Sequence, residues 1–150
     1  MNSQDPTVVL SLTVSDVIAA LDFYAKAFDA KEVARMTMPD GTLVHAEVMI
    51  GNSLFYVSIG SEEWKAVPLA QGSLAPCLFA VSVDEVDGAF EKVLSAGGTK
   101  IEGPQDQFWG MRTAVISDPF GYRWVVRKMT EELSPDEVMK RAAEMMAGGK

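Results

Sequence analysis

Hydrophobic positions along the chain follow two periods, one typical of strands and one typical of helices. Short apolar, β-branched runs at residues 8–14 and 77–83 predict buried strands. An acidic residue follows each run, and apolar residues then recur every three or four positions. These positions are Val17, Ala20, Leu21, Tyr24 and Phe28 in the first stretch and Val86, Ala89, Phe90, Val93 and Leu94 in the second. The pattern predicts two strand–helix units whose helices pack on a sheet.

Three further strands are predicted after each helix. They cover about 32–38, 42–50 and 53–59 in the first half and about 99–103, 111–117 and 122–128 in the second. Pro39-Asp40-Gly41, Gly51-Asn52 and Asp118-Pro119-Phe120-Gly121 provide the residues that tight turns require. Each half therefore has the order strand, helix, strand, strand, strand.

The two halves are also similar in sequence, at an offset of about 69 residues. Val14-Ser15-Asp16-Val17 corresponds to Val83-Asp84-Glu85-Val86, and Gly41 corresponds to Gly110 at the same offset. Helices and turn glycines that keep one order indicate a duplicated structural unit. We therefore predict an α+β fold of two tandem βαβββ modules that form a cupped mixed sheet.

A chain of 150 residues fits a single domain. Its predicted parts are module one at about 7–60, a linker at about 61–76, module two at about 77–128 and a C-terminal helix at about 135–147. Ser134, Pro135 and Glu137 predict the start of that last helix, because they match a capping box with proline in the first turn. Its methionine-rich apolar stripe is expected to pack on the domain or on a second subunit, and lining a ligand is the alternative.

Composition and charge narrow the partners that this domain can have. Apolar residues make up 48% and charged residues 23%, which is typical of globular proteins. Because 13 Lys and Arg stand against 21 Asp and Glu, the net charge is −8, and we expect neither nucleic acid nor a membrane as a partner. No apolar stretch approaches the roughly 20 residues that span a bilayer, and no signal pattern opens the chain. With a single cysteine, Cys77, the chain is expected to be cytoplasmic.

The tandem modules resemble the vicinal oxygen chelate superfamily of glyoxalases, bleomycin-resistance proteins and extradiol dioxygenases. The first module opens with V-x-D-V and the second closes on the DPFG turn at 118–121. His45-Ala46-Glu47 after a Pro-Asp-Gly turn, the run DQFWG at 106–110, and Trp124 after DPFG resemble the PhnB-like branch. The resemblance implies a U-shaped sheet from each half, a small-molecule pocket inside the two cups, and a homodimer.

The superfamily's metal-dependent members carry four ligands, a His or Gln and a Glu from each half. The resemblance places these ligands at Val9, Phe55, Leu78 and Val125, whose side chains have no lone pair for a divalent ion. Tyr122 also stands where relatives commonly have His. We therefore expect no metal and no cofactor, and a divalent metal bound mainly by carboxylates is the alternative.

The strand at 42–50 carries the candidate catalytic residues His45 and Glu47. Alternation places them on one face, inside the cup if the resemblance holds, whereas Ala46 and Val48 face the core. A histidine beside a carboxylate can act as a general base. The structural alternative is that the two side chains satisfy each other in the pocket wall or are solvated. The repeat at an offset of 69 gives them the counterparts Ala114 and Ile116, so the site is expected on one side only.

Five further residues are candidates for ligand binding. They are Tyr56, Phe108, Trp109, Arg112 and Tyr122. Arg112 is suited to an anionic ligand group, although pairing with an acidic residue is the alternative. Phe108 and Trp109 either cover a ligand or fill a gap in the core, and Tyr56 either lies beside the ligand or belongs to the core.

Three functional hypotheses follow. The first is a metal-independent small-molecule pocket, with a reaction, if there is one, that uses His45 and Glu47. The second is a glyoxalase-like lyase or isomerase with a shifted metal site at the same two residues. The third is a drug-sequestering resistance protein, whose acidic surface attracts a cationic, planar drug.

Overall fold

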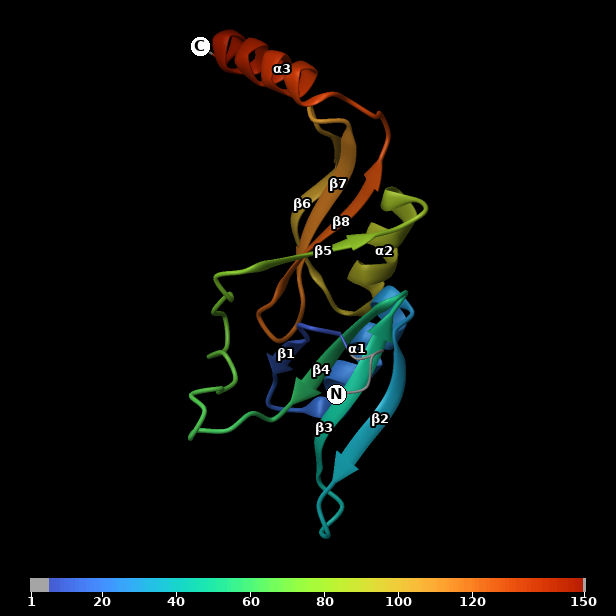
Figure 1. Ribbon diagram of the computed structural model, residues 1–150. Helices are drawn as coiled ribbons and strands as arrows, with labels where there is room; N and C mark the ends of the chain where they lie inside the picture. The colour runs from blue at the N-terminus through green and yellow to red at the C-terminus, as the bar shows by residue number, and fades with distance from the viewer. Residues whose placement is uncertain (1–5, 150) are drawn as a thin grey trace.

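Two four-stranded sheets, each with one helix against one face, follow one another along the chain (Figure 1). The structure is a computed structural model that describes residues 6–149. The elements of module one are β1 (Leu10–Thr13), α1 (Val17–Phe28), β2 (Lys31–Thr37), β3 (Leu43–Ile50) and β4 (Ser53–Ser58). The elements of module two are β5 (Leu78–Ser82), α2 (Val86–Ala96), β6 (Thr99–Asp106), β7 (Met111–Ser117) and β8 (Arg123–Met129), and α3 (Pro135–Gly148) follows them.

The two sheets have the same topology. Sheet 1 has the strand order β1-β4-β3-β2 and sheet 2 the order β5-β8-β7-β6. In each sheet the first and last strands of the module pair in parallel, and the other pairs are antiparallel. This arrangement confirms the predicted α+β class and the βαβββ repeat, with one mixed sheet for each module.

The acidic residue after each opening strand caps the helix that follows. Asp16 accepts a hydrogen bond of 3.0 Å from the backbone N–H of Ala19, and the Glu85 carboxylate accepts from Asp87 and Gly88. These contacts satisfy N–H groups that have no partner within the helix. The acidic positions of the repeated V-x-D-V pattern therefore have a structural explanation.

One hydrophobic core extends through both modules. Helix α1 packs against α2, and the rings of Phe28 and Trp124 lie 4.7 Å apart across the module boundary. Tyr24 and Trp124 are buried, as the sequence predicts for core residues. Cys77, which the sequence places on a buried strand, is instead exposed just before β5.

The carboxylate of Asp118, in the DPFG turn, connects the two modules. It accepts hydrogen bonds from the Tyr24 hydroxyl at 2.6 Å, from the Trp124 indole at 3.0 Å, and from the backbone N–H groups of Phe120 and Tyr122 at 2.9 Å each. Burial raises the pKa of this carboxyl, and burial together with the neighbouring Asp118 raises the pKa of Tyr24 well above its usual value. The turn therefore holds α1 and β8 together.

Helix α3 extends away from sheet 2 (Figure 1). Ser134 accepts a hydrogen bond from the backbone N–H of Glu137, as the capping pattern predicts. None of the described residues of α3 is buried. The first of the two expectations, that the methionine-rich stripe packs into its own domain, is therefore not met. Over residues 6–149, no helix is both long and apolar enough to cross a membrane.

Candidate functional site

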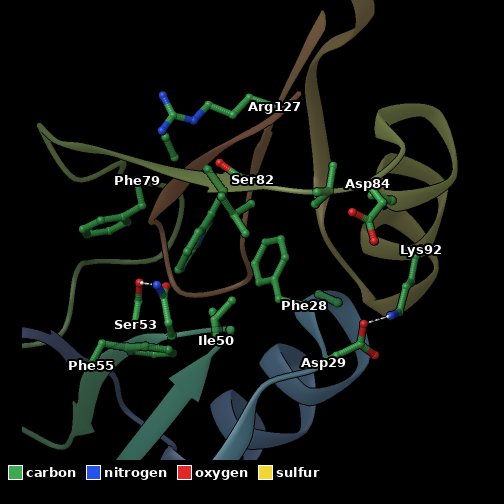
Figure 2. A pocket seen from close by; sticks show the side chains of 18 of the residues that line it. Phe28, Asp29, Ile50, Ser53, Phe55, Phe79, Ser82, Asp84, Lys92 and Arg127 are labelled. Carbon is green, nitrogen blue, oxygen red and sulfur yellow. Dashed lines mark hydrogen bonds and ion pairs between the residues drawn. The ribbon is translucent and has the colours of Figure 1, made fainter. Parts of the chain in front are cut away.

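A cleft of about 920 Å³ lies between the two modules (Figure 2). On the module-one side it is lined by the β3–β4 turn and the start of β4, and on the module-two side by β5 and the first turns of α2. Four aromatic residues from both modules form its floor, namely Phe28, Phe55, Phe79 and Trp124. The Phe79 and Trp124 rings are 5.1 Å apart, so the floor is a continuous packed layer.

Charged side chains lie at two places around the cleft. At one end, Lys92 of α2 forms a 2.6 Å ion pair with Asp29, the residue that ends α1. On the module-two side, Arg127 of β8 is the register partner of Ser82 in β5. Within residues 6–149, neither the Arg127 nor the Ser82 side chain makes a hydrogen bond or ion pair.

The two sides of the module junction are lined by different side chains. Helices α1 and α2 keep the offset of 69 residues, so Val93 is the counterpart of Tyr24. Strand registers make Ile50 the counterpart of Asp118 and Ser53 the counterpart of Tyr122. Val93 and Ser53 are smaller than their counterparts Tyr24 and Tyr122, whereas Ile50 is larger than Asp118 and is apolar. Ile50 and Ser53 both line the cleft.

The same registers correct the sequence alignment of the two halves within β3 and β7. Ala46 pairs with Val57 and Ala114 with Val126, and all four residues are fully buried, so the offset between these strands is 68. The counterparts of His45 and Glu47 are therefore Thr113 and Val115, and the predicted counterparts Ala114 and Ile116 are wrong. A register error of one residue moves a side chain to the opposite face of a strand.

The position of the fourth superfamily metal ligand also changes. Phe55 is buried against Tyr24, with ring centroids 5.6 Å apart, so it faces α1. Its neighbour Tyr56 is the counterpart of Val125 and lies on the other face of sheet 1. Among the residues that the structure describes, no group of three or more His, Cys, Asp and Glu side chains is placed to hold a metal ion. The residues present do not fit the superfamily's metal site.

His45, Glu47 and Tyr56 lie together on the face of sheet 1 that points away from α1. Glu47 is the register partner of Tyr56, and the His45 ring lies 5.0 Å from the Tyr56 ring, edge to face. His45 and Glu47 are half-buried, and the described structure has no hydrogen bond between them. None of the three lines the inter-module cleft. The structure therefore groups three predicted residues at a place separate from the cleft.

Arg112 pairs with acidic residues, as the structural alternative held. Its guanidinium lies 2.6 Å from Asp87 on α2 and 3.0 Å from Asp106 on β6. Hydrogen bonds to these carboxylates raise the pKa of Arg112, and the hydrogen bond to Arg112 lowers the pKa of Asp87. This arginine lies on the α2 side of sheet 2, away from the cleft lining.

Phe108 and Trp109 occupy the β6–β7 turn, because β6 extends through Gly103 and Pro104 to Asp106 and is longer than predicted. Their rings pack edge to face at 4.8 Å, and Trp109 is 40% exposed. Tyr122 is buried, and its hydroxyl donates to the Thr13 carbonyl at 2.8 Å and accepts from the Thr13 N–H at 2.9 Å. None of these three residues lines the inter-module cleft.

Sequence reasoning missed the residues that line the cleft, including Phe28, Phe79, Ser82, Lys92 and Arg127. One signal was available. In the strand of β8, alternation places Arg127 on the face opposite the buried Trp124 and Val126, beside the apolar Val125. An arginine beside apolar positions of a strand indicates a ligand or an interface.

Comparisons with known proteins agree with this fold. The family model described as Glyoxalase/Bleomycin resistance protein/Dioxygenase superfamily matches residues 6–126. The uncharacterized protein Mb0911c of Mycobacterium bovis is 35% identical over 140 residues, covering 89% of this chain and 90% of that protein.

Two solved structures show the same architecture. The crystal structure of TioX from Micromonospora sp. ML1 has a TM-score of 0.62 at 24% identity, covering 86% of this chain and all of that one. A glyoxalase/bleomycin resistance protein/dioxygenase family enzyme from Burkholderia phytofirmans PsJN has a TM-score of 0.67 at 20% identity, covering 81% and 96%. With its two βαβββ modules and the family match across both of them, the chain belongs to the glyoxalase, bleomycin-resistance protein and dioxygenase superfamily.

Proposed function

We propose that this protein binds a small organic molecule in the cleft between its modules and does so without the superfamily's metal ion. The observation that carries the proposal is the cleft of about 920 Å³ with its aromatic floor. Ligand sites in proteins are concave, mostly apolar and lined by a few polar groups, and they often lie where two units meet. The cleft lies where two units meet and has an aromatic floor, and charged side chains also line it.

A matched pair of variants tests this site. Ala80→Trp places an indole in the cleft, because Ala80 is exposed on β5 and lines it, whereas Ala34→Trp adds the same bulk on β2, outside the cleft. We expect ligands found in a small-molecule library by native mass spectrometry to bind the wild type and Ala34→Trp, and to be lost from Ala80→Trp. Loss of ligand binding in Ala34→Trp but not in Ala80→Trp would contradict the proposal. It would place the ligand on the face of sheet 1 that carries His45 and Glu47.

The metal-independent part of the proposal is supported by the donor set. Val9, Leu78 and Val125 offer no lone pair, and Tyr56 is the one superfamily ligand position with an oxygen. A lyase or isomerase with a shifted metal site at His45 and Glu47 is the rival. A thermal-shift screen with Mg, Mn, Ni, Zn and Co separates the two, because a bound metal stabilises the folded state as RT ln(1 + [L]/Kd). A saturable shift that Glu47→Gln abolishes would favour the rival.

A second candidate function is catalysis at the His45 face. The position of His45, Glu47 and Tyr56 on one face of sheet 1 favours it, since an imidazole and a carboxylate are side chains that act as general acids and bases. Turnover without metal that falls in His45→Gln and persists in Ala80→Trp would support an enzyme of this type. The drug-sequestering alternative needs a cationic ligand, which the −8 net charge favours. The cleft lining also has more acidic than basic side chains, with Asp29, Asp84 and Glu85 against Lys92 and Arg127.

We also propose that the protein is a homodimer. Three methionines of α3 are exposed, with Met139, Met145 and Met146 at 69%, 56% and 78%, whereas Val138 and Ala142 are half-buried. A second copy offers an identical stripe, so the two helices can bury each other around a two-fold axis. A cytoplasmic location and the absence of nucleic-acid and membrane partners stay proposals, supported by the free Cys77 and the net charge of −8. Membership of the PhnB-like branch is likewise proposed, on the residues His45 to Glu47 and the DQFWG run.

A further inference from the structure

We propose that the inter-module cleft binds aromatic molecules that carry a phenolic hydroxyl, and that this hydroxyl hydrogen-bonds to the backbone of Ser82. The inference rests on the proposed function, because it names the ligand class of the same cleft. Tyr122 makes such a contact with the opening strand of module one, and the equivalent contact is missing at the opening strand of module two.

The hydroxyl of Tyr122 completes the outer edge of β1. It donates to the Thr13 carbonyl at 2.8 Å and accepts from the Thr13 N–H at 2.9 Å. The next residue, Val14, donates instead to Ser58 at the end of β4, at 2.8 Å. Alternate residues of a strand in parallel pairing direct their backbone groups to opposite sides, so those of Thr13 point away from β4. A phenol satisfies both groups because its hydroxyl donates one hydrogen bond and accepts another.

The backbone of Ser82 has the same orientation but lacks the phenol. Ser82 is the counterpart of Thr13, since the parallel strand pairs of the two modules keep an offset of 69 residues. The Val83 N–H donates to Arg127 of β8 at 3.0 Å, so the Ser82 groups point away from β8. On that side β5 has no neighbouring strand within residues 6–149, and neither the N–H nor the C=O of Ser82 has a hydrogen-bond partner there.

The counterpart of Tyr122 in module one is a serine. Ser53 holds this position, and it lines the cleft. Phe79, whose ring lies 6.0 Å from the Tyr122 ring, has the counterpart Leu10, which lines the cleft as well. Ser82 lines the module-two side, across from Ser53 (Figure 2). The counterparts of the Tyr122 surroundings therefore border one open space, in which a ligand ring can take the place of the missing tyrosine ring.

A neutral aromatic ligand also suits the rest of the lining. The floor of four aromatic residues offers edge and face contacts to a further ring. Carboxylates outnumber cations around the cleft, with Asp29, Asp84 and Glu85 against Lys92 and Arg127, so the lining does not favour an anion. A phenol is neutral at pH 7, because its pKa lies near the value of about 10 for tyrosine.

Matched phenols and methyl ethers test the ligand class. The probes are 4-phenylphenol with 4-methoxybiphenyl, and 2-naphthol with 2-methoxynaphthalene, titrated at pH 7 by NMR of the isotope-labelled protein. The ether keeps the rings but cannot donate, and its methyl group obstructs the approach to the strand edge. We expect the phenols to bind about fivefold to a hundredfold more tightly, the range for two neutral hydrogen bonds. The Ser82 amide signal should shift with the phenols, and Ala80→Trp should abolish their binding whereas Ala34→Trp keeps it.

Substitutions at Ser53 test the same geometry without a ligand. Ser53→Tyr places the tyrosine of the repeat in the cleft, and Ser53→Phe adds the ring without the hydroxyl. We expect both variants to lose the phenols, and Ser53→Tyr to have a Tm about 2–4 °C above that of Ser53→Phe, as for one neutral hydrogen bond or slightly more. Thr37→Tyr and Thr37→Phe are the control pair, because Thr37 is exposed at the end of β2, outside the cleft lining. Their Tm values should agree.

The possible failures are distinguishable. Ethers that bind as tightly as phenols, no binding of either, or equal Tm values for Ser53→Tyr and Ser53→Phe would overturn the ligand class. The proposed function would still stand if Ala80→Trp abolished the binding of other ligands from the small-molecule library. If those ligands bound to Ala80→Trp as they do to the wild type, the proposed function would fail as well.

Discussion

The hydroxyl of Tyr24 on α1 donates a 2.6 Å hydrogen bond to Asp118, which lies 94 residues further along the chain in module two. This contact connects a helix of one module with the closing turn of the other. The aspartate accepts three further hydrogen bonds, so its position is fixed from both modules. This buried carboxylate therefore joins the two modules, together with the packing of α1 on α2 and the hydrogen bonds between Tyr122 and Thr13.

Asp118→Ala should therefore destabilise the whole protein. The change leaves the Tyr24 hydroxyl and the Trp124 indole buried without an acceptor, and we expect a loss of about 3 kcal/mol or more in the free energy of unfolding. Asp40→Ala is the control, because Asp40 accepts one hydrogen bond, from the Thr42 N–H, in an exposed turn. Urea unfolding followed by circular dichroism measures both variants. Equal losses in the two variants would contradict the role of the junction.

The raised pKa of Tyr24 predicts a loss of stability in alkali. In the unfolded chain a tyrosine ionises near pH 10, whereas burial next to Asp118 keeps Tyr24 protonated to higher pH in the folded state. Above pH 10 the unfolded state therefore binds fewer protons than the folded state, and stability falls as pH rises. Tyr24→Phe should reduce this slope relative to the wild type between pH 10 and pH 11, although it lowers stability at pH 7. An unchanged slope would show that Tyr24 does not carry the effect.

The sequence predicted the repeated order of elements because helix stripes and turn residues are local patterns. It did not predict which face of β3 corresponds to which face of β7. The helices keep an offset of 69 residues, but β3 and β7 are offset by 68, and one residue reverses the face. The cleft was missed for a different reason. Its position depends on how α1 packs on α2, which no local sequence pattern reveals. It also depends on Ile50 and Ser53, which occupy in module one the repeat positions of Asp118 and Tyr122.

Alanine substitutions at Gly110, in the turn before β7, and at Gly41 should differ in their cost, because only Gly110 has close neighbours. Gly110 has a φ of +83°, and a Cβ atom there would come within 3.0 Å of the Glu131 carbonyl oxygen. Gly41 has a φ of +91° and no atom within 4 Å of the same position. Gly41→Ala should cost about 1 kcal/mol from backbone strain alone, and Gly110→Ala should cost clearly more. Thermal unfolding of the two variants checks this, and equal shifts in Tm would contradict the steric part.

If the exposed methionines of α3 join two copies of the chain, charged residues in their place should disrupt the homodimer. Met139 and Met146 lie one above the other on the apolar side of the helix, and neither is covered by the rest of the described chain. The double change Met139→Glu with Met146→Glu should convert a dimer into a monomer, because it would bury four carboxylates in a two-fold contact. Size-exclusion chromatography with light scattering measures the mass. Lys140→Glu, on the polar side of the same helix, is the control that should leave the dimer intact. A monomeric wild type, or a dimer that survives the double change, would show that α3 does not join two copies.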